Sequence, residues 1–104
     1  MNLHGTNLAG AYLPGADLTG AYLAGSYLRG AHLQHARLKG TDLTGADLGG
    51  TQLEGADLTG ADLGGAQLEN AVGLTQRQVD SARGNKQTEL PPGVVMPESW
   101  KQSS

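Results

Sequence analysis

The sequence predicts an all-β solenoid built from a five-residue unit. Leucine recurs at every fifth position from Leu3 to Leu68 without a break. From Leu8 onward, a small residue precedes each leucine by two positions. Glycine follows each leucine by two positions except at His35 and Asn70. The unit is therefore small, polar, leucine, variable, glycine, and self-similarity at a fixed period is the signature of a repeat architecture.

A period of five excludes an ordinary helix and a straight strand. On a helix, at about 100° per residue, the leucines would scatter around the axis. On a strand, an odd period would send successive leucines to opposite faces. A chain that turns once per unit removes both conflicts, because the small residue and the leucine, two positions apart, then point the same way. Glycine suits the corner since it tolerates positive φ.

The composition limits what else the 104-residue chain can be. Its 17 glycines would also fit a flexible linker, but their strict register argues for order. The chain contains no cysteine, so it has no disulfide or thiolate site, and we expect a cytoplasmic protein. Its length allows one domain. We expect neither a membrane span nor a signal peptide, because the sequence shows no apolar run of about 18 residues and no basic, apolar leader.

Three units resemble a known family. Residues 16–20 and 56–60 read Ala-Asp-Leu-Thr-Gly, and residues 46–50 read Ala-Asp-Leu-Gly-Gly. They resemble the pentapeptide-repeat family, whose motif is A(D/N)LXX, and the resemblance covers residues 4–70. Periodicity alone would allow coils of three, four or five sides. The resemblance implies four sides, that is, a right-handed quadrilateral parallel β-helix of about three and a half coils over residues 1–70.

The leucines are expected to fill the interior of that helix. Neighbouring coils would pair as short parallel strands about 4.8 Å apart. A fully buried leucine contributes roughly 1.5–3 kcal/mol, which the ordering of the chain largely offsets, so the ends of the solenoid matter. The predicted core ladder consists of Leu8, Leu13, Leu18, Leu23, Leu28, Leu33, Leu38, Leu43, Leu48, Leu53, Leu58, Leu63 and Leu68.

Residues 71–104 leave the five-residue register and are predicted to cap the C-terminal end of the core. Thr75, followed three positions later by Gln78, forms a capping-box pattern and predicts a short helix over about 76–83. Gly84 would close this helix in the left-handed position that follows a helix end.

Beyond the helix, three prolines between positions 91 and 97 predict extended chain. The tail is similar to a C-terminal extension common in bacterial members of the family, which implies a structural role. Trp100 is expected to pack against the core and not to anchor a partner. Leu74 and Val79 have the spacing of a hydrophobic staple. The predicted cap residues are Leu74, Thr75, Val79, Leu90 and Trp100.

The N-terminal end lacks a comparable cover, because Met1 and Asn2 run straight into Leu3. An exposed sheet edge invites pairing with another chain. Either two protomers stack through their first coils, or Met1 alone blunts the end and the molecule is monomeric. We favour a homodimer.

Outward residues 20 positions apart are expected to stack in ladders. One ladder alternates in sign, which favours mutual support of neighbouring coils. Another places Asp42 over Asp62, a like-charge pair that either indicates a functional position or, as we favour, is a by-product of repeat duplication. The three ladders are Asp17, Arg37 and Asp57; Asn2, Tyr22, Asp42 and Asp62; and Asn7, Tyr27, Asp47 and Gln67.

Charge is uneven along a chain of net charge −3. Residues 21–40 carry Arg29, Arg37 and Lys39 and no acid, whereas residues 41–69 carry six acids and no base. Direct binding of nucleic acid is not expected, because it requires a broad basic face. The candidate acidic interaction surface consists of Asp42, Asp47, Glu54, Asp57, Asp62 and Glu69.

The resemblance implies an alternative function for that acidic surface. Some pentapeptide-repeat proteins mimic DNA and bind or protect DNA gyrase. The length argues against this role here, since a solenoid of about 17 Å matches only about five base pairs. Phenylalanine, which often takes the leucine position in those members, is also absent.

Nothing in the sequence is typical of an enzyme. His32 and His35 fall on different positions of the unit and have no neighbouring acid to complete a zinc site. The serines have no histidine and aspartate arranged around them, and a leucine-filled interior leaves no substrate pocket. We expect no catalytic residue, cofactor or metal. The sequence favours a non-enzymatic interaction protein, a rigid β-helix that presents its ladders to a protein partner.

Overall fold

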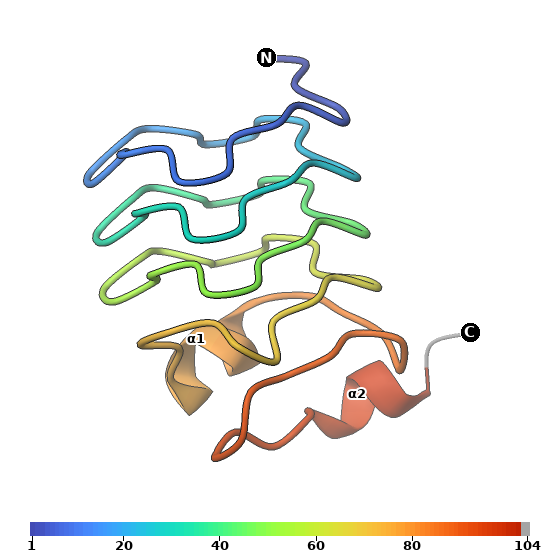
Figure 1. The fold of residues 1–104 in the computed structure, drawn as a ribbon. Coiled ribbons are helices and arrows are strands. Elements are labelled where there is room, and N and C mark those ends of the chain that lie inside the picture. Colours follow the sequence, from blue (N-terminus) through green and yellow to red (C-terminus); the bar gives the residue numbers. More distant parts are fainter. Residues whose placement is uncertain (103–104) are drawn as a thin grey trace.

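The computed structural model describes residues 1–102. The chain winds as a stack of coils, with the N-terminus at one end and two short helices at the other (Figure 1). From Asn2 to Asp47, each outward polar residue of the register pairs in parallel with the residue 20 positions further on, as Asn2 does with Tyr22 and Tyr22 with Asp42. One turn of the chain therefore holds four five-residue units, and the ladders predicted from the sequence run along its sides.

Coils are joined by parallel pairs one residue wide, in place of the predicted short strands. Two residues of every unit form the turn, which leaves little straight chain on each side. Hydrogen bonds still link the coils: the N–H of Leu3 donates to the carbonyl of Tyr22 at 2.7 Å, and the N–H of Tyr22 donates to that of Met1 at 2.8 Å. We call residues 1–20, 21–40 and 41–60 the first, second and third coils.

The corners of the coils lie at the repeated glycines. All twelve glycines of the five-residue register have φ between 64° and 71°, the left-handed region that a residue without a Cβ enters at no steric cost. His35 stands at the equivalent corner with φ of 61° and is the one non-glycine residue among 1–102 with positive φ. Its ring lies over Gly55, where a Cβ would collide with it. Asn70, the other exception, lies outside the left-handed region.

The interior is filled by leucines and small residues. From Leu23 to Leu68 each leucine of the register is at most 1% exposed. In the first coil Leu18 is 8% exposed, and the remaining leucines are only partly buried against the core. Within residues 1–102 the burial of the core therefore decreases toward the N-terminal end. The partly buried leucines are Leu3, Leu8 and Leu13.

Buried hydroxyl groups support the turns from inside. Thr41 Oγ1 donates to the carbonyl of Leu18 at 2.7 Å, and Thr51 Oγ1 donates to that of Leu28 at 2.6 Å. Ser26 occupies the same place in its unit and is fully buried, yet its hydroxyl has no hydrogen-bond partner within residues 1–102. Threonine at this position thus satisfies a polar group that serine leaves unpaired.

Helix α1 spans Gln76–Ser81 and begins where the capping box predicts. The Thr75 hydroxyl accepts the N–H of Gln78 at 3.3 Å, and Gln78 Oε1 accepts the N–H of Thr75 at 2.7 Å. Val79 is fully buried, and Leu74 packs against the same core. The helix ends two residues before the predicted position 83, because Ala82 is extended and returns the chain to the coil edge.

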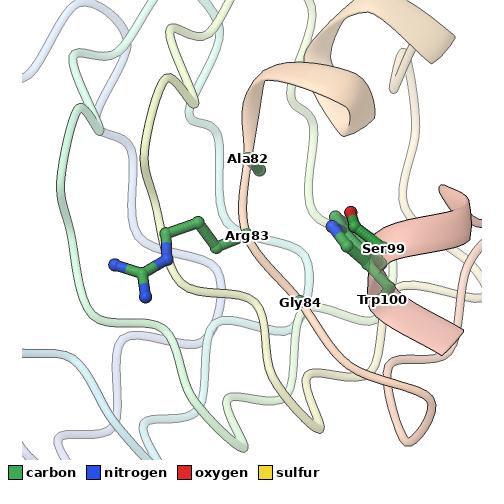
Figure 2. Close-up of a pocket in the computed structure, with 5 residues that line it drawn as sticks. All are labelled: Ala82, Arg83, Gly84, Ser99 and Trp100. Atoms are coloured by element: carbon green, nitrogen blue, oxygen red, sulfur yellow. The ribbon is translucent and has the colours of Figure 1, made fainter. Parts of the chain in front are cut away.

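Gly84 does not close α1 as predicted. Its φ is not in the positive range, and it lies two residues beyond the C-cap, Ala82. A Cβ at Gly84 would lie 2.7 Å from ring carbons of Trp100. Figure 2 shows both residues among those that line one pocket. Glycine is therefore needed here for close approach of an aromatic ring.

The prediction of extended chain is wrong for residues 98–101. Helix α2 spans Glu98–Lys101 and follows directly on Pro97. Proline forbids a helix interior but is tolerated at a helix start, so the three prolines permit this turn. Trp100, only 3% exposed, is buried against the core as the sequence predicts.

Parallel pairing continues past the end of the repeat register. Val72 pairs with Gln52, and two further pairs join Arg83 to Asp62 and Glu89 to Gln67. The tail therefore adds to the stack of coils while α1 and α2 cover its end (Figure 1). Neither helix of residues 1–102 has the length or the apolar character needed to cross a membrane.

Candidate interaction surfaces

The parallel pairs define four sides of the solenoid, which follow one another around each coil. Each side is a column of outward residues. In every unit the leucine follows the outward residue, and a two-residue corner follows the leucine. Side 1 contains Asn2, Tyr22, Asp42, Asp62 and Arg83; side 2 contains Asn7, Tyr27, Asp47, Gln67 and Glu89; side 3 contains Tyr12, His32, Gln52 and Val72; and side 4 contains Asp17, Arg37 and Asp57.

The candidate acidic residues do not gather on one side. Asp42 and Asp62 lie on side 1, Asp47 on side 2 and Asp57 on side 4. The two glutamates stand at corners, Glu54 after side 3 and Glu69 after side 2. Asp47 is moreover paired with Arg29 from the preceding coil at 3.3 Å. The acidic stretch of the sequence thus becomes a band around the solenoid, partly neutralised by the basic coil beside it.

Aspartates before a leucine hold the turns that follow them. Asp42 Oδ1 accepts the N–H of Thr44 at 3.0 Å and its hydroxyl at 2.6 Å. Asp57 binds Thr59 in the same way, at 3.1 and 2.7 Å. These bonds favour the charged carboxylate and lower the pKa of both aspartates. The Asp of the Ala-Asp-Leu unit therefore stabilises the turn that follows it by accepting these hydrogen bonds.

The alternating ladder on side 4 is weaker than its sign pattern suggests. Among residues 1–102 no ion pair joins Arg37 to Asp17 or to Asp57. The hydroxyl and N–H of Thr19 lower the pKa of Asp17, and the charge of Arg37 is the smallest of the causes. Local turn bonds, and not the neighbouring coil, dominate the environment of this carboxylate.

Three tyrosines of the first two coils are exposed, and the sequence reasoning did not single them out as a site. Tyr12, Tyr22 and Tyr27 are 78%, 52% and 54% exposed. They lie on three consecutive sides of the first two coils. The ring centroids of Tyr12 and His32 are 5.4 Å apart, and those of His4 and Tyr22 are 6.0 Å apart. The available signal was a tyrosine in the polar position of the unit, which must point outward. We call these three residues the tyrosine surface.

A carboxylate pair links the last repeat to the cap. Glu69 raises the pKa of Glu89 by a hydrogen bond between the two carboxyl groups and by charge repulsion. The two residues meet because Glu89 pairs with Gln67, an offset of 22 instead of 20. This offset could not be read from the repeat, so sequence reasoning missed the pair.

The remaining candidates do not assemble into a chemical site. The ring of His32 lies beside Tyr12 and that of His35 over Gly55, so the two histidines contact different neighbours. Residues 1–102 hold no group of three metal-binding side chains. A pocket at the cap is lined by Ala82, Arg83, Gly84, Ser99 and Trp100, and Figure 2 shows the Arg83 side chain pointing away from Ser99 and Trp100.

The predicted cap residues all lie at the covered end. Val79 and Trp100 are buried, Leu74 and Leu90 are half-buried against the core, and Thr75 caps α1. Among the leucines of the predicted ladder, those at 8 and 13 are only partly buried. The two ends of the core therefore differ in cover.

Comparison with known proteins identifies relatives of the same architecture. A family model described as pentapeptide repeats matches residues 2–40 and 36–72, with eight copies. The crystal structure of alr5209, a pentapeptide repeat protein from Nostoc Pcc 7120, superposes with a TM-score of 0.68 at 32% identity, over 90% of this chain and 77% of that one. The pentapeptide repeat protein Rfr23 from the cyanobacterium Cyanothece 51142 gives 0.52 at 30% identity, over 86% of this chain and 63% of that one.

Two further comparisons add nothing on function. The fluoroquinolone resistance protein QnrB1 matches at a TM-score of 0.43 and 16% identity, over 89% of this chain and 61% of that one, which is too distant to carry an argument. Curated protein sequences yield no match. The repeat register, the four-sided pairing and these matches agree, and the chain belongs to the pentapeptide-repeat family, whose members fold as a right-handed β-helix solenoid.

Proposed function

We propose that this protein is a non-enzymatic interaction module, a rigid β-helix that binds a protein partner through its outward side chains. The exposed tyrosine surface is the observation that carries the proposal. Tyrosine is enriched at protein interfaces, because it offers a large contact area and a polar hydroxyl at little cost in conformational entropy.

Backbone pairing supports the idea that this surface is preorganised. Tyr22 and Tyr27 each donate their N–H to the first coil, and their carbonyls accept the N–H groups of Leu3 and Leu8 at 2.7 Å. Both residues are thus held at their backbones in one coil, on adjoining sides. A surface that is ordered before binding loses less entropy when the partner docks.

The solenoid interior supports a non-catalytic role. Fully buried leucines occupy the axis of the second and third coils, and the pocket beside Trp100 lies outside this interior, at the cap. Substrate sites are usually concave and contain a few convergent polar groups. The interior of this solenoid offers packing in place of such a site.

The partner is best captured with a photo-crosslinking amino acid at Ala24, at the corner between Tyr22 and Tyr27. The same amino acid at Thr59, in the third coil, serves as the control. A protein crosslinked from Ala24 and not from Thr59 is identified by mass spectrometry and purified. Its Kd for the solenoid is then measured by isothermal titration calorimetry.

The double variant Tyr22→Ser/Tyr27→Ser is expected to weaken that binding at least about tenfold, since interface aromatics often contribute more than 1.4 kcal/mol together. Lys39→Ala, at the corner that follows side 4, is the matched control and should bind as the parent does. An unchanged Kd in the double variant would contradict the proposal.

The DNA-mimic alternative gains less support from the geometry. A mimic needs a continuous acidic face, because B-DNA carries one charge per about 1.7 Å of axis. Here the aspartates are divided among three sides, the two glutamates stand at corners, and Asp47 is paired with Arg29. We expect no inhibition or protection of purified DNA gyrase in a supercoiling assay at high molar excess of the solenoid. Inhibition that Asp42→Asn/Asp62→Asn abolishes would restore the alternative.

A further inference from the structure

The first coil leaves an open edge of main-chain groups. In later coils each outward residue is paired on both groups to the coil before it, as Tyr22 is through its N–H and its carbonyl. Within residues 1–102 the equivalent N–H and carbonyl groups of the first coil make no hydrogen bond. These unpaired groups belong to Asn2, Asn7, Tyr12 and Asp17, one residue on each of the four sides.

Apolar side chains accompany this edge. Leu3, Leu8 and Leu13 are only partly buried, whereas each leucine from Leu23 onward is at most 1% exposed. Met1 is 69% exposed at the same end. Covering these side chains would contribute roughly 25 cal/mol per Å² of apolar surface. An unpaired edge around an apolar centre is a template for a further β-layer.

We propose that a second copy of this chain covers the open edge, so that two copies stack through their first coils. The edge presents donors and acceptors side by side on all four sides, and it is therefore complementary to itself. Two identical surfaces related by a two-fold axis form the commonest closed assembly. The opposite end of the solenoid is occupied by α1, α2 and Trp100, which leaves the N-terminal end for association.

Charge favours this arrangement over other stackings. Asp17 is the one formally charged side chain of the first coil, whereas the second coil carries three bases and residues 41–69 carry six acids. Stacking through the first coils brings two nearly neutral layers together. The two basic coils would then be three coil spacings apart, about 14 Å, which exceeds the screening length of about 8 Å at physiological salt.

The size of the end predicts a weak dimer. The two shorter extents of the molecule are 24 and 19 Å, which limits the buried area to about 460 Å² per copy. The total of about 900 Å² lies below the roughly 1,200–2,000 Å² of stable interfaces. We therefore expect association in the micromolar to millimolar range, visible as a concentration-dependent mass.

Sedimentation equilibrium on the purified 104-residue chain, from about 5 μM to about 1 mM, tests the proposal. The average mass should rise from 10.7 kDa toward twice that value. Ala11→Asp places a carboxylate at a half-buried position of the open end, which the second copy would bury further. It should weaken association at least about tenfold, while Ala11→Ser, which places a serine at the small-residue position as Ser26 does three units further on, should not. A constant 10.7 kDa, or a dimer insensitive to Ala11→Asp, would overturn the proposal.

The distance between spin labels on the two copies tests how the copies stack. The chain contains no cysteine, so Thr19→Cys and Thr59→Cys each give one label on the same side of the solenoid. In the proposed dimer the separation along the axis is about 19 Å greater for the Thr59 pair, because each label lies two coil spacings further from the interface. Equal separations, or a shorter one for the Thr59 pair, would overturn stacking through the first coils.

Discussion

The two ends of this solenoid are finished in different ways. At the C-terminal end the chain leaves its register, forms α1, continues the pairing through Arg83 and Glu89, and buries Trp100 on Gly84. At the N-terminal end Leu3, Leu8 and Leu13 remain partly exposed and the edge is unpaired within residues 1–102. Repetition therefore builds the middle of the molecule, while each end requires its own solution.

Removing Trp100 should have the largest effect on this contrast. Trp100→Ala deletes a side chain that is 3% exposed and opens the covered end. We expect a loss of about 3–5 kcal/mol in the free energy of unfolding, measured by urea denaturation. Met1→Ala, the matched change at the open end, removes a side chain that is 69% exposed and should cost little. Equal losses would show that the two ends contribute alike.

The same leucine should matter more inside the stack than at its open end. Leu28 is fully buried, and Leu8 stands one coil earlier on the same side with only partial burial. Leu28→Ala should cost about 2–5 kcal/mol, and Leu8→Ala less than half of that, because less apolar surface returns to water. Thermal unfolding of the two variants provides the measurement. A larger loss for Leu8→Ala would mean that its end is already covered.

Two buried hydroxyls, those of Thr41 and Ser26, occupy the same position of their five-residue units but should contribute differently to stability. Thr41→Val removes the bond to the Leu18 carbonyl and should destabilise by about 1 kcal/mol. Ser26→Ala removes a buried hydroxyl that lacks a partner within residues 1–102, and it should be neutral or stabilising. Urea midpoints report both changes. A loss for Ser26→Ala as large as that for Thr41→Val would show that the Ser26 hydroxyl is bonded in solution.

The smallest expected effect concerns how the free energy of unfolding depends on pH. One carboxylate in the coils and one at the cap should contribute with opposite signs. The pKa of Asp42 is lowered by its bonds to Thr44, so its stabilisation is present above the ordinary pKa and is lost as pH falls through the lowered value. The pKa of Glu89 is raised by Glu69, so its ionisation destabilises the fold as pH rises through the raised value.

Asp42→Asn should therefore reduce the acid sensitivity of the stability, while Glu89→Gln should stabilise at pH 7 and have no effect well below pH 4. Urea denaturation from pH 3 to pH 7 measures both trends. A gain for Glu89→Gln that persists at pH 3 would assign it to something other than charge repulsion.

The repeats were predictable from the sequence because one set of local rules recurs in them. The polar position of Asp42 and the corner at Gly45 follow from the register, and the pairing at 20 residues follows once four sides are assumed. The capping box at Thr75 was predictable for a similar reason, since its partners lie three residues apart.

One-off contacts were not predictable. The role of Gly84 depends on a tryptophan 16 positions away, and α2 forms because Trp100 is buried there. The ion pair of Arg29 with Asp47 depends on an offset of 18. The Glu69–Glu89 pair depends on the offset of 22 at which Glu89 pairs with Gln67, which the five-residue register does not contain. The candidate acidic surface was predicted from one continuous stretch of sequence. In the structure, the four-sided coil places these residues on different sides.

Amide hydrogen exchange, followed by NMR at about 50 μM and about 1 mM, tests the contrast between the ends most directly. The amides of Arg83 and Glu89, bonded to the carbonyls of Ala61 and Ala66 at 2.7 and 2.9 Å, should be protected at both concentrations. The amides of Asn7 and Tyr12, unpaired within residues 1–102, should exchange rapidly at the lower concentration and slow at the higher one. Equal protection of both ends at low concentration, or first-coil amides that stay rapid when the chain is concentrated, would contradict the account.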